Sequence, residues 1–216
     1  MDTNKHLFFE GKAAGPQIEF VDLGLSVKWG NANLGATNGN TKESWYGNYY
    51  SWGEIETKTK YNWTTYKYAS NGNSNKLTKY CNNAEYGNEG FTDGLTQLVL
   101  EDDVATQTNS TWRMPTKKDF EELKAGTTKK WVTNYKGVSG LNGRLFTGNN
   151  GNSLFIPAAG YYYASFVENA GSYCYLWSSS LRSDNPYFAY YLNFYSGNIY
   201  MRDNSRCYGL SVRPIC

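Results

Sequence analysis

Hydrophobic residues occur along this chain in short groups separated by glycine and asparagine, and only two stretches have helical spacing. In the first, Leu95, Leu98 and Val99 recur three and four residues apart, which places them on one face of a helix. This spacing predicts a helix near 92–100, with Gly94 as a destabilising residue inside it.

The second helical pattern begins at Thr116. Thr116 stands three residues before Asp119, an arrangement similar to a capping box, in which each side chain bonds the backbone N–H of the other residue. Phe120 and Leu123 then form an apolar stripe, and Gly126 marks the end. The chain is therefore expected to contain two short helices.

The remaining apolar residues lie in short runs bounded by turn signals, which is typical of strands. Two short strands are predicted around Gly24, between Ile18 and Trp29. The dipeptides Asn142-Gly143 and Asn150-Gly151 are turn signals, and the runs beside them have the pattern of hairpin arms. The later strands are predicted at 144–146, 154–156, 161–163, 175–180, 187–194 and 210–213.

The polar positions are mostly uncharged, since the 216 residues include 24 Asn, 22 Gly and 20 Tyr, and only 19% are charged. Asn and Gly favour turns, whereas Tyr, Trp and Phe favour strands, so the composition indicates a turn-rich, β-leaning domain. Long loops are expected at 30–50 and 57–90, the second anchored by Tyr61, Trp63 and Tyr66. Four tryptophans beside small residues or turns are expected in the core: Trp29, Trp52, Trp112 and Trp177.

Charge and ligand-forming residues exclude several classes of function. The formal net charge of +2 argues against a strongly basic nucleic-acid binder, and no apolar run is long enough for a membrane helix. The only histidine, His6, stands near the first residue, so a Ser-His-Asp or Cys-His mechanism lacks its base. The acidic triplet 101–103 lacks the spacing of a calcium loop. We expect no cofactor, no metal site and no enzymatic activity.

The four cysteines, Cys81, Cys174, Cys207 and Cys216, do not have metal-ligand spacing. Their even number is compatible with free thiols or with a disulfide, and a chain of this length does not need one to fold. Residues 1–16 are expected to form a polar lead-in without a classical export signal, followed by one domain over 17–216.

The segment 181–208 has a distinct composition. It includes six Tyr, four Asn, three Ser and three Arg. Antibody loops use these residue types, because Tyr gives a large contact area at low entropy cost while Asn and Ser adapt their hydrogen bonds. Ala189, Leu192, Phe194 and Ile199 have the positions of buried anchors, so the residues between them are expected to face solvent or a ligand. An exposed aromatic patch of this size normally marks a binding surface.

Six sequence blocks resemble one known family. They occur in the family's order over about residues 19–215, and together they resemble the Fibrobacter succinogenes major paralogous domain, a family abundant in gut Bacteroidetes. The blocks are Val21-Asp22-Leu23-Gly24-Leu25-Ser26-Val27-Lys28-Trp29, Tyr50-Ser51-Trp52-Gly53-Glu54, Trp112-Arg113-Met114-Pro115-Thr116, Phe155-Ile156-Pro157-Ala158-Ala159-Gly160, Trp177-Ser178-Ser179-Ser180 and Ser211-Val212-Arg213-Pro214.

The family resembles proteins with a C-type lectin-like fold. This implies an α+β architecture with two short helices, small mixed antiparallel sheets, long structured loops and a pairing of 21–25 with 210–213. The calcium-dependent lectin motifs Glu-Pro-Asn and Trp-Asn-Asp do not occur here, which argues against calcium-dependent sugar binding. Formylglycine-generating enzymes also have a lectin-like fold, but Cys207 and Cys216 do not have the spacing of their cysteine motif.

A subset of these proteins resembles the variable proteins of diversity-generating retroelements, whose C-terminal segment is mutated at template adenines, so that Asn codons become Tyr, Ser, Asp, Phe, Arg or Cys codons. The resemblance implies a scaffold of Trp177, Ala189, Leu192, Phe194, Gly209 and Arg213. The implied variable, ligand-binding positions are Ser183, Asn185, Tyr187, Phe188, Tyr191, Asn193, Tyr195, Asn198, Tyr200, Arg202, Asp203, Ser205, Cys207 and Tyr208.

These expectations combine into one functional hypothesis. The chain is expected to be a receptor-like or adhesin-like binding domain at the cell surface or outside the cell, on a cell or on a phage. Its ligand is expected to be a protein or a cell-surface glycan, because the candidate surface is broad and both polar and aromatic. The alternative is a structural surface subunit, similar to a fimbrial subunit, that uses the same face for self-association.

Overall fold

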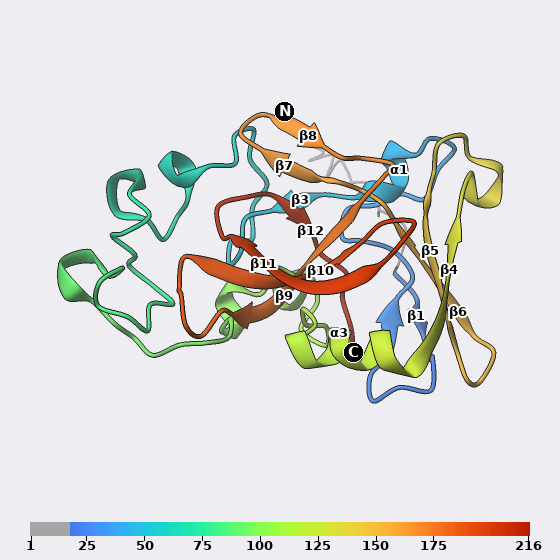
Figure 1. Cartoon of the computed structure of the whole chain (residues 1–216), viewed down its shortest axis with the longest axis horizontal. Helices are drawn as coiled ribbons and strands as arrows, with labels where there is room; N and C mark the ends of the chain where they lie inside the picture. Colours follow the sequence, from blue (N-terminus) through green and yellow to red (C-terminus); the bar gives the residue numbers. More distant parts are fainter. Residues whose placement is uncertain (1–17) are drawn as a thin grey trace, which may run out of the picture.

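The computed structural model describes residues 18–216, so the expected lead-in, 1–16, lies outside the described residues. The described part is an α+β structure with short helices and several small sheets, as expected, but residues 18–216 contain three α-helices where two helices were expected (Figure 1). Its helices are α1 (Glu43–Tyr46), α2 (Val104–Thr108) and α3 (Lys117–Gly126). The strands are β1 (Phe20–Val21), β2 (Trp29–Gly30), β3 (Tyr49–Tyr50), β4 (Thr127–Val132), β5 (Gly143–Gly148), β6 (Ser153–Pro157), β7 (Tyr161–Tyr163), β8 (Phe166–Glu168), β9 (Cys174–Leu181), β10 (Phe188–Phe194), β11 (Ile199–Ser205) and β12 (Leu210–Ser211).

Helix α3 confirms the prediction made from the capping pattern. The Asp119 N–H donates to the Thr116 hydroxyl at 3.2 Å, and the Thr116 N–H donates to the Asp119 carboxylate at 2.7 Å. Arg113 adds a bidentate ion pair to that carboxylate. The apolar stripe of Phe120 and Leu123 is buried, and α3 packs on one face of the sheet formed by β9, β10 and β11 (Figure 1).

The helix predicted near 92–100 is wrong. This stretch pairs with the edge of β9 instead, where the Leu98 N–H donates to the Ser179 carbonyl at 2.9 Å and the Leu181 N–H donates to the Thr96 carbonyl at 2.8 Å. Because the sheet uses these backbone groups, they are not free to form helical hydrogen bonds.

Helix α2 begins several residues later than the predicted helix. Its N-cap is Asp103, whose carboxylate accepts hydrogen bonds from the N–H groups of Ala105 and Thr106. An aspartate in this position stabilises the free N–H groups of the first turn. The capping residue rather than the apolar spacing therefore determines where the helix starts.

The central sheet has five strands in the order β11-β10-β9-β12-β3. β9, β10 and β11 pair antiparallel in sequence order, whereas β12 lies parallel to β9 and antiparallel to β3. The last strand of the chain therefore lies inside the sheet, between two strands that precede it.

The two ends of the described chain pair with each other, but not in the expected register. The expected pairing of 21–25 with 210–213 is wrong, because the Asp22 carboxylate and the positive φ of Gly24 form a turn there. The pairing lies a few residues further on. The Gly30 N–H donates to the Pro214 carbonyl at 2.8 Å, and the adjacent Trp29 bridges Ile215 antiparallel.

A second sheet, β4-β5-β6, and the hairpin β7-β8 complete the strand structure. The predicted hairpin between β5 and β6 is confirmed, with Asn150-Gly151 in its turn. Asn142-Gly143 does not form a turn, because Gly143 is the first residue of β5. A Cβ atom at Gly143 would lie 2.2 Å from the Ile156 carbonyl oxygen, so glycine is needed there for the close approach of β6.

The core lies on both sides of the central sheet. Leu192 and Phe194 of β10 belong to the apolar cluster on the α3 side, and Trp177 of β9 belongs to the cluster on the opposite side, which also contains Trp52. Trp29, Trp52 and Trp177 are fully buried, as predicted. The prediction for Trp112 holds only in part, because its ring packs against the cluster that contains Trp52 but is only partly buried, edge-on against Phe20.

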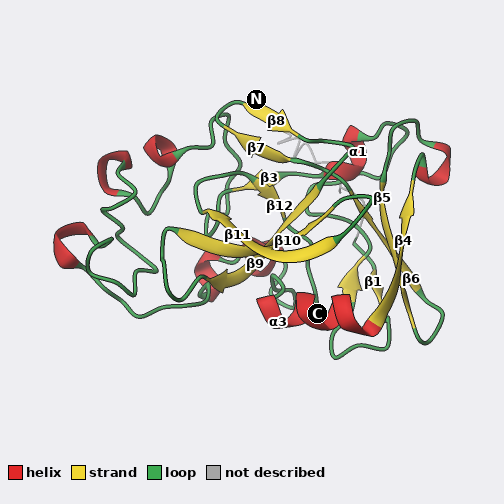
Figure 2. Cartoon of the chain, viewed as in Figure 1, coloured by secondary structure: helices red, strands yellow, loops and turns green. Residues whose placement is uncertain are grey.

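The loop 57–90 is long and irregular, as expected, and its regular structure consists of single helical turns (Figure 2). Tyr61 and Tyr66 are buried anchors, and their hydroxyls donate to the carbonyls of Tyr49 and Trp52. Trp63 is only partly buried. The loop is therefore fixed to the domain at several points along its length.

Candidate binding face

The β10–β11 hairpin carries many of the residues expected to bind a ligand. In its register Tyr191 lies opposite Arg202, and Asn193 lies opposite Tyr200. Because side chains alternate between the two faces of a strand, these four residues share one face of the sheet. Leu192 points to the other face, where α3 packs. The candidate binding face therefore lies on the side of the sheet opposite α3, where Tyr191 itself belongs to the core cluster that contains Trp177.

Seven tyrosines make a continuous group of ring contacts on this face, and we call this group the tyrosine face. Its members are Tyr161, Tyr163, Tyr173, Tyr175, Tyr191, Tyr195 and Tyr208. Successive ring centroids are 5.6 Å apart for Tyr191 and Tyr175, 4.8 Å for Tyr175 and Tyr161, 5.8 Å for Tyr161 and Tyr208, 5.1 Å for Tyr208 and Tyr163, 6.3 Å for Tyr175 and Tyr173, and 5.2 Å for Tyr173 and Tyr195.

The tyrosine face is assembled from β7, β9, β10 and the segments that flank β11, which are far apart in the sequence. Only Tyr191 is buried, while the other six rings are partly or fully accessible. Contacts between aromatic rings contribute about 0.5–1.5 kcal/mol per pair beyond their burial. The rings are therefore held in fixed positions while their hydroxyl groups remain available to a ligand.

A polar rim surrounds these rings. The Arg202 guanidinium lies 4.8 Å from the centroid of the Tyr200 ring. The amides of Asn169 and Asn198 donate to the hydroxyls of Tyr175 and Tyr195 at 3.2 and 3.3 Å. This combination of rings, amides and one cation can form both stacking contacts and hydrogen bonds.

Burial raises the pKa of four phenols of the tyrosine face, those of Tyr161, Tyr175, Tyr191 and Tyr208, and the shift is largest for Tyr191 and Tyr208. Burial, followed by the nearby Cys207, raises the pKa of Tyr208 to about 12. Burial also raises the pKa of Tyr191, with Tyr175 as the next contribution. Both phenols therefore stay protonated at neutral pH and can donate hydrogen bonds.

Four of the fourteen predicted binding residues are buried, and the expectation that they are exposed is wrong. For the first two, the side-chain contacts give the reason. The Tyr191 ring, 6% exposed, is stacked on Tyr175 and packs edge-on against Trp177. The Asn193 amide donates to the Cys174 carbonyl at 2.9 Å, which fixes it between neighbouring strands.

The other two buried residues, Ser205 and Cys207, lie where the chain leaves β11. Ser205 is paired with Phe188, and its carbonyl accepts a hydrogen bond from the Tyr208 N–H. The Cys207 carbonyl accepts a hydrogen bond from the Ser51 hydroxyl. Burial raises the pKa of the Cys207 thiol to about 12, so it stays protonated at neutral pH. All four cysteines are unpaired, and only Cys216 is exposed.

Three more predicted residues contact the loop 57–90. The Trp63 indole N–H donates to the Tyr187 hydroxyl at 2.8 Å, and the Asn185 amide donates to the Tyr86 hydroxyl at 3.3 Å. The Ser183 carbonyl accepts a hydrogen bond from the amide of Asn82. This end of the segment 181–208 is therefore continuous with the loop, and Trp63 joins the candidate surface.

Two further predicted residues, Phe188 and Asp203, lie beside Arg182. Arg182 donates to Asp203 at 2.9 Å, and its guanidinium lies 5.7 Å from the centroid of the Phe188 ring. Arg182 also forms an ion pair with Asp184 at 2.7 Å. The structure therefore does not bring all fourteen predicted residues onto one surface. Of those that remain accessible, Tyr195, Asn198, Tyr200, Arg202 and Tyr208 lie at the tyrosine face or its rim.

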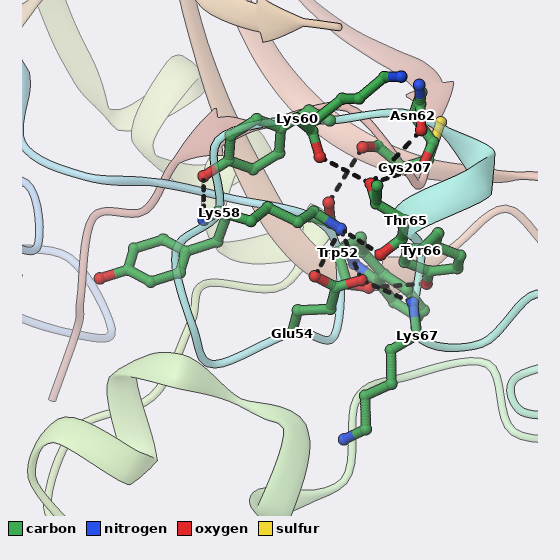
Figure 3. Close-up of polar contacts among 12 residues, drawn as sticks. Trp52, Glu54, Lys58, Lys60, Asn62, Thr65, Tyr66, Lys67 and Cys207 are labelled. Carbon is green, nitrogen blue, oxygen red and sulfur yellow. Dashed lines mark hydrogen bonds and ion pairs between the residues drawn. The ribbon is translucent and has the colours of Figure 1, made fainter. Parts of the chain in front are cut away.

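The base of the loop 57–90 is held by a compact polar network, shown in Figure 3. The Glu54 carboxylate accepts hydrogen bonds from the Lys58 ammonium group at 2.9 Å and from the Lys67 backbone N–H at 2.8 Å. Lys58 also donates to the Thr65 carbonyl at 3.0 Å. Because one carboxylate binds both sides of the loop entrance, this network fixes the loop's path.

Arg206 is the most important structural residue that the sequence analysis missed. Its side chain is fully buried and packs against the rings of Trp52, Tyr66 and Tyr80. It donates to the Tyr66 hydroxyl and to three backbone carbonyls, those of Lys79, Tyr80 and Pro186, at 2.9–3.0 Å. The composition of 181–208 places Arg206 among the recognition residues, whereas in the structure it joins the loop 57–90 to this C-terminal segment. No sequence signal marks Arg206 as buried, because its partners Tyr66 and Tyr80 lie 140 and 126 residues away in the sequence.

The scaffold residues behave as expected: Trp177, Ala189, Leu192, Phe194 and Arg213 are fully buried, and Gly209 is also buried. Burial lowers the pKa of Arg213 to about 9, with a smaller opposing contribution from Cys174. The Arg213 guanidinium donates to the Gly30 carbonyl at 3.0 Å, close to the pairing of the two chain ends.

Among residues 18–216, no three His, Cys, Asp or Glu side chains gather as a metal ion would require. No helix in that range has the length and apolar character needed to cross a membrane.

Comparison with known proteins gives one match. No curated protein and no solved structure shows a significant similarity to the chain. Residues 127–215 match the family model of a domain of unknown function, DUF8237. The matched region begins at β4 and contains the whole tyrosine face and all fourteen predicted binding residues, while the loop 57–90 and α3 precede it.

Proposed function

We propose that this chain is a non-enzymatic binding domain whose ligand, a protein or a cell-surface glycan, contacts the tyrosine face and its polar rim. The observation that carries the proposal is the continuous group of seven tyrosines, of which six are accessible. Exposed Tyr, Asn and Arg are the residue types of recognition surfaces.

A C-type lectin-like fold is part of this proposal. Three features support it: the chain ends pair at Trp29 and Ile215, the last strand lies inside the central sheet, and a long structured loop packs beside that sheet. The proposal also includes membership of the Fibrobacter succinogenes major paralogous domain family and a location at the cell surface or outside the cell. Both rest on the six sequence blocks described above.

We further propose that the accessible positions of 181–208 vary between related proteins by retroelement-directed mutation. Ten of the fourteen implied positions are partly or fully accessible, which supports this, because a variable residue is tolerated only where it does not hold the core. The gene tests it. A near-copy of the segment's coding sequence, differing at adenines and lying beside a reverse transcriptase gene, is the expected finding, and a gene without such a copy would remove this part of the proposal.

Binding is tested with a triple variant, Tyr195→Ser, Tyr200→Ser and Tyr208→Ser, on a glycan array and on intact bacterial cells. Loss of aromatic anchors from a binding surface typically weakens binding by more than about tenfold. The matched control is Phe91→Ser with Leu100→Ser, which removes exposed apolar side chains elsewhere. Equal binding by the triple variant and the wild type would show that the tyrosine face is not the site.

The alternative function is a structural surface subunit that associates with itself. One observation favours it. Tyr163 of the tyrosine face pairs with Phe166 of β8, and Phe166 is among the most exposed apolar side chains. An analytical ultracentrifugation series on the wild type and the triple variant distinguishes the two functions, because a structural subunit loses self-association when the face is changed.

A further inference from the structure

The β7–β8 hairpin exposes more apolar surface than any comparable part of the described chain. Phe166 is 71% exposed, Tyr163 is 48% exposed and Val167 is 40% exposed. These are three of the five large hydrophobic residues that are exposed among residues 18–216. Clustered exposed apolar residues mark interaction surfaces, whereas single ones need no explanation.

The outer edge of β8 also presents backbone groups for pairing. Tyr162 exchanges both of its backbone hydrogen bonds with Gly209, at 2.7 and 3.0 Å, so it does not bond Val167, which lies opposite. In an antiparallel pair, the residues of such a non-bonded position direct their N–H and C=O groups outward. The Val167 N–H and C=O therefore point away from β7, where no other strand of residues 18–216 pairs with β8.

Natural proteins protect an open strand edge with Lys, Pro or a bulge, or by keeping it short. β8 has the sequence Phe-Val-Glu and no bulge, so only its shortness and the charge of Glu168 protect it. The edge is thus suited to receive a strand.

We infer that β8 pairs antiparallel with β8 of a second copy of this chain, with Val167 on the two-fold axis. In this register each Val167 exchanges two backbone hydrogen bonds with its symmetry mate, and Phe166 lies opposite Glu168 of the other copy. One strand thus provides both halves of the interface, which is what a two-fold symmetric contact requires.

Charge complementarity supports a second copy as the occupant. Tyr61 pairs antiparallel with Ala164, which places the exposed Lys60 beside Ser165. Under the two-fold axis Ser165 lies opposite Asn169 of the other copy, next to that copy's Glu168. The pairing therefore brings Lys60 of each copy to the same end of the interface as Glu168 of the other copy. By symmetry this occurs at both ends, and no like charges are placed against each other.

The available area sets the strength of this association. The three exposed side chains supply on the order of 300 Å² per copy, so the pair buries about half of the roughly 1,200 Å² at which stable interfaces begin. We therefore expect weak self-association, with a dissociation constant on the order of 0.1 mM. The inference does not rest on the proposed function, although the two surfaces share Tyr163.

Sedimentation velocity over a concentration series tests the association. The wild type is expected to dimerise, and Phe166→Lys with Val167→Lys is expected to weaken dimerisation by more than about tenfold. Leu100→Lys is the matched control, because Leu100 is 67% exposed but lies far along the chain, in a single helical turn before α2. A monomeric wild type at about 1 mM, or an equal effect of Leu100→Lys, would overturn the inference.

Disulfide trapping tests the register. In a Cys216→Ser background, Val167→Cys is expected to form a covalent dimer under oxidised glutathione, because opposed Cα atoms at a bonded position lie about 5.5 Å apart. Ser165→Cys, which lies opposite residue 169 of the other copy, is expected to cross-link at least about tenfold more slowly. Equal trapping at both positions would overturn this register. Dimerisation that appears only after residues 1–17 are removed would show that the chain's own N-terminal residues occupy the edge.

Discussion

Arg206 shows how one side chain determines the shape of the candidate surface. It bonds three carbonyls and a phenol in the interior, and its charge is balanced by these groups and by aromatic rings. A buried guanidinium with complete hydrogen bonding holds its partners in one arrangement. The loop 57–90 and the segment 181–208 therefore keep a fixed relation, with Trp63 beside Tyr187.

We expect Arg206→Met to lower the free energy of unfolding by at least about 3 kcal/mol, because it leaves several buried acceptors without a donor. Urea denaturation measures the change. Arg202→Met is the matched control: Arg202 lies on the same strand region but is exposed, so its replacement should cost less than about 0.5 kcal/mol. Equal effects of the two substitutions would contradict a structural role for Arg206.

Tyr191 and Tyr200 lie on the same face of β10–β11 but have different surroundings. Tyr191→Ser should lower the free energy of unfolding by about 3 kcal/mol, because its ring is buried between Tyr175 and Trp177. Tyr200→Ser should cost less than about 1 kcal/mol, because Tyr200 remains partly exposed. Thermal and urea unfolding of both variants provide the comparison. A Tyr191 variant as stable as the wild type would return this residue to the freely variable set.

At the scale of elements, helix α3 depends on Asp119, which serves both the helix cap and the ion pair with Arg113. Burial alone would raise the pKa of Asp119, but the hydrogen bonds from Arg113 and Thr116 outweigh it and bring the pKa below its usual value. A carboxylate with a lowered folded-state pKa stabilises the fold fully above its unfolded pKa of about 3.9, and this contribution is lost as the pH falls through the folded-state value.

We therefore expect Asp119→Asn to be less stable than the wild type at neutral pH, with the difference shrinking below about pH 4. Urea denaturation across this range measures both. Asp103 is kept in both proteins. Burial raises the pKa of its carboxyl and gives it the opposite pH dependence, so a substitution there would obscure the effect of Asp119. A difference that stays constant down to about pH 2 would show that the charge of Asp119 does not matter.

Local sequence signals correctly predicted those elements whose hydrogen-bonding partners lie close together along the chain. The capping residues of α3 are three positions apart, and only four residues separate β5 from β6, so both patterns are complete within a short window. The helix predicted at 92–100 failed because Ser179, more than eighty residues away, takes the backbone hydrogen bond of Leu98. Nonlocal pairing of this kind is invisible to a periodicity.

The binding residues were predicted from composition, which cannot distinguish exposure from burial. Tyr191 and Tyr195 are identical in type and four residues apart, yet only Tyr191 is covered by rings from β9. Tyr161 and Tyr163 were predicted only as part of a strand, because they lie outside the segment 181–208 and join the tyrosine face through the fold.

At the scale of the whole molecule, the expectation of no metal site leads to a prediction about thermal stability. Among residues 18–216 no cluster of metal-ligating side chains is present. We expect the melting temperature to be unchanged by EDTA to within about 1 °C. Differential scanning calorimetry with and without the chelator tests this, and a decrease of more than about 5 °C, worth on the order of 1–2 kcal/mol, would contradict it.

The position of β12 inside the central sheet has a consequence for how the protein is made. β9 and β3 have no direct contact in the sheet order, and residues 210–211 are the strand that joins them. During synthesis the ribosome must therefore release almost the whole described chain before this sheet can close. Until then the adjoining edges of β3 and β9 are open to non-native pairing. Because long-range pairing also slows folding, the nascent chain remains in this vulnerable state for longer than a helical protein of equal length.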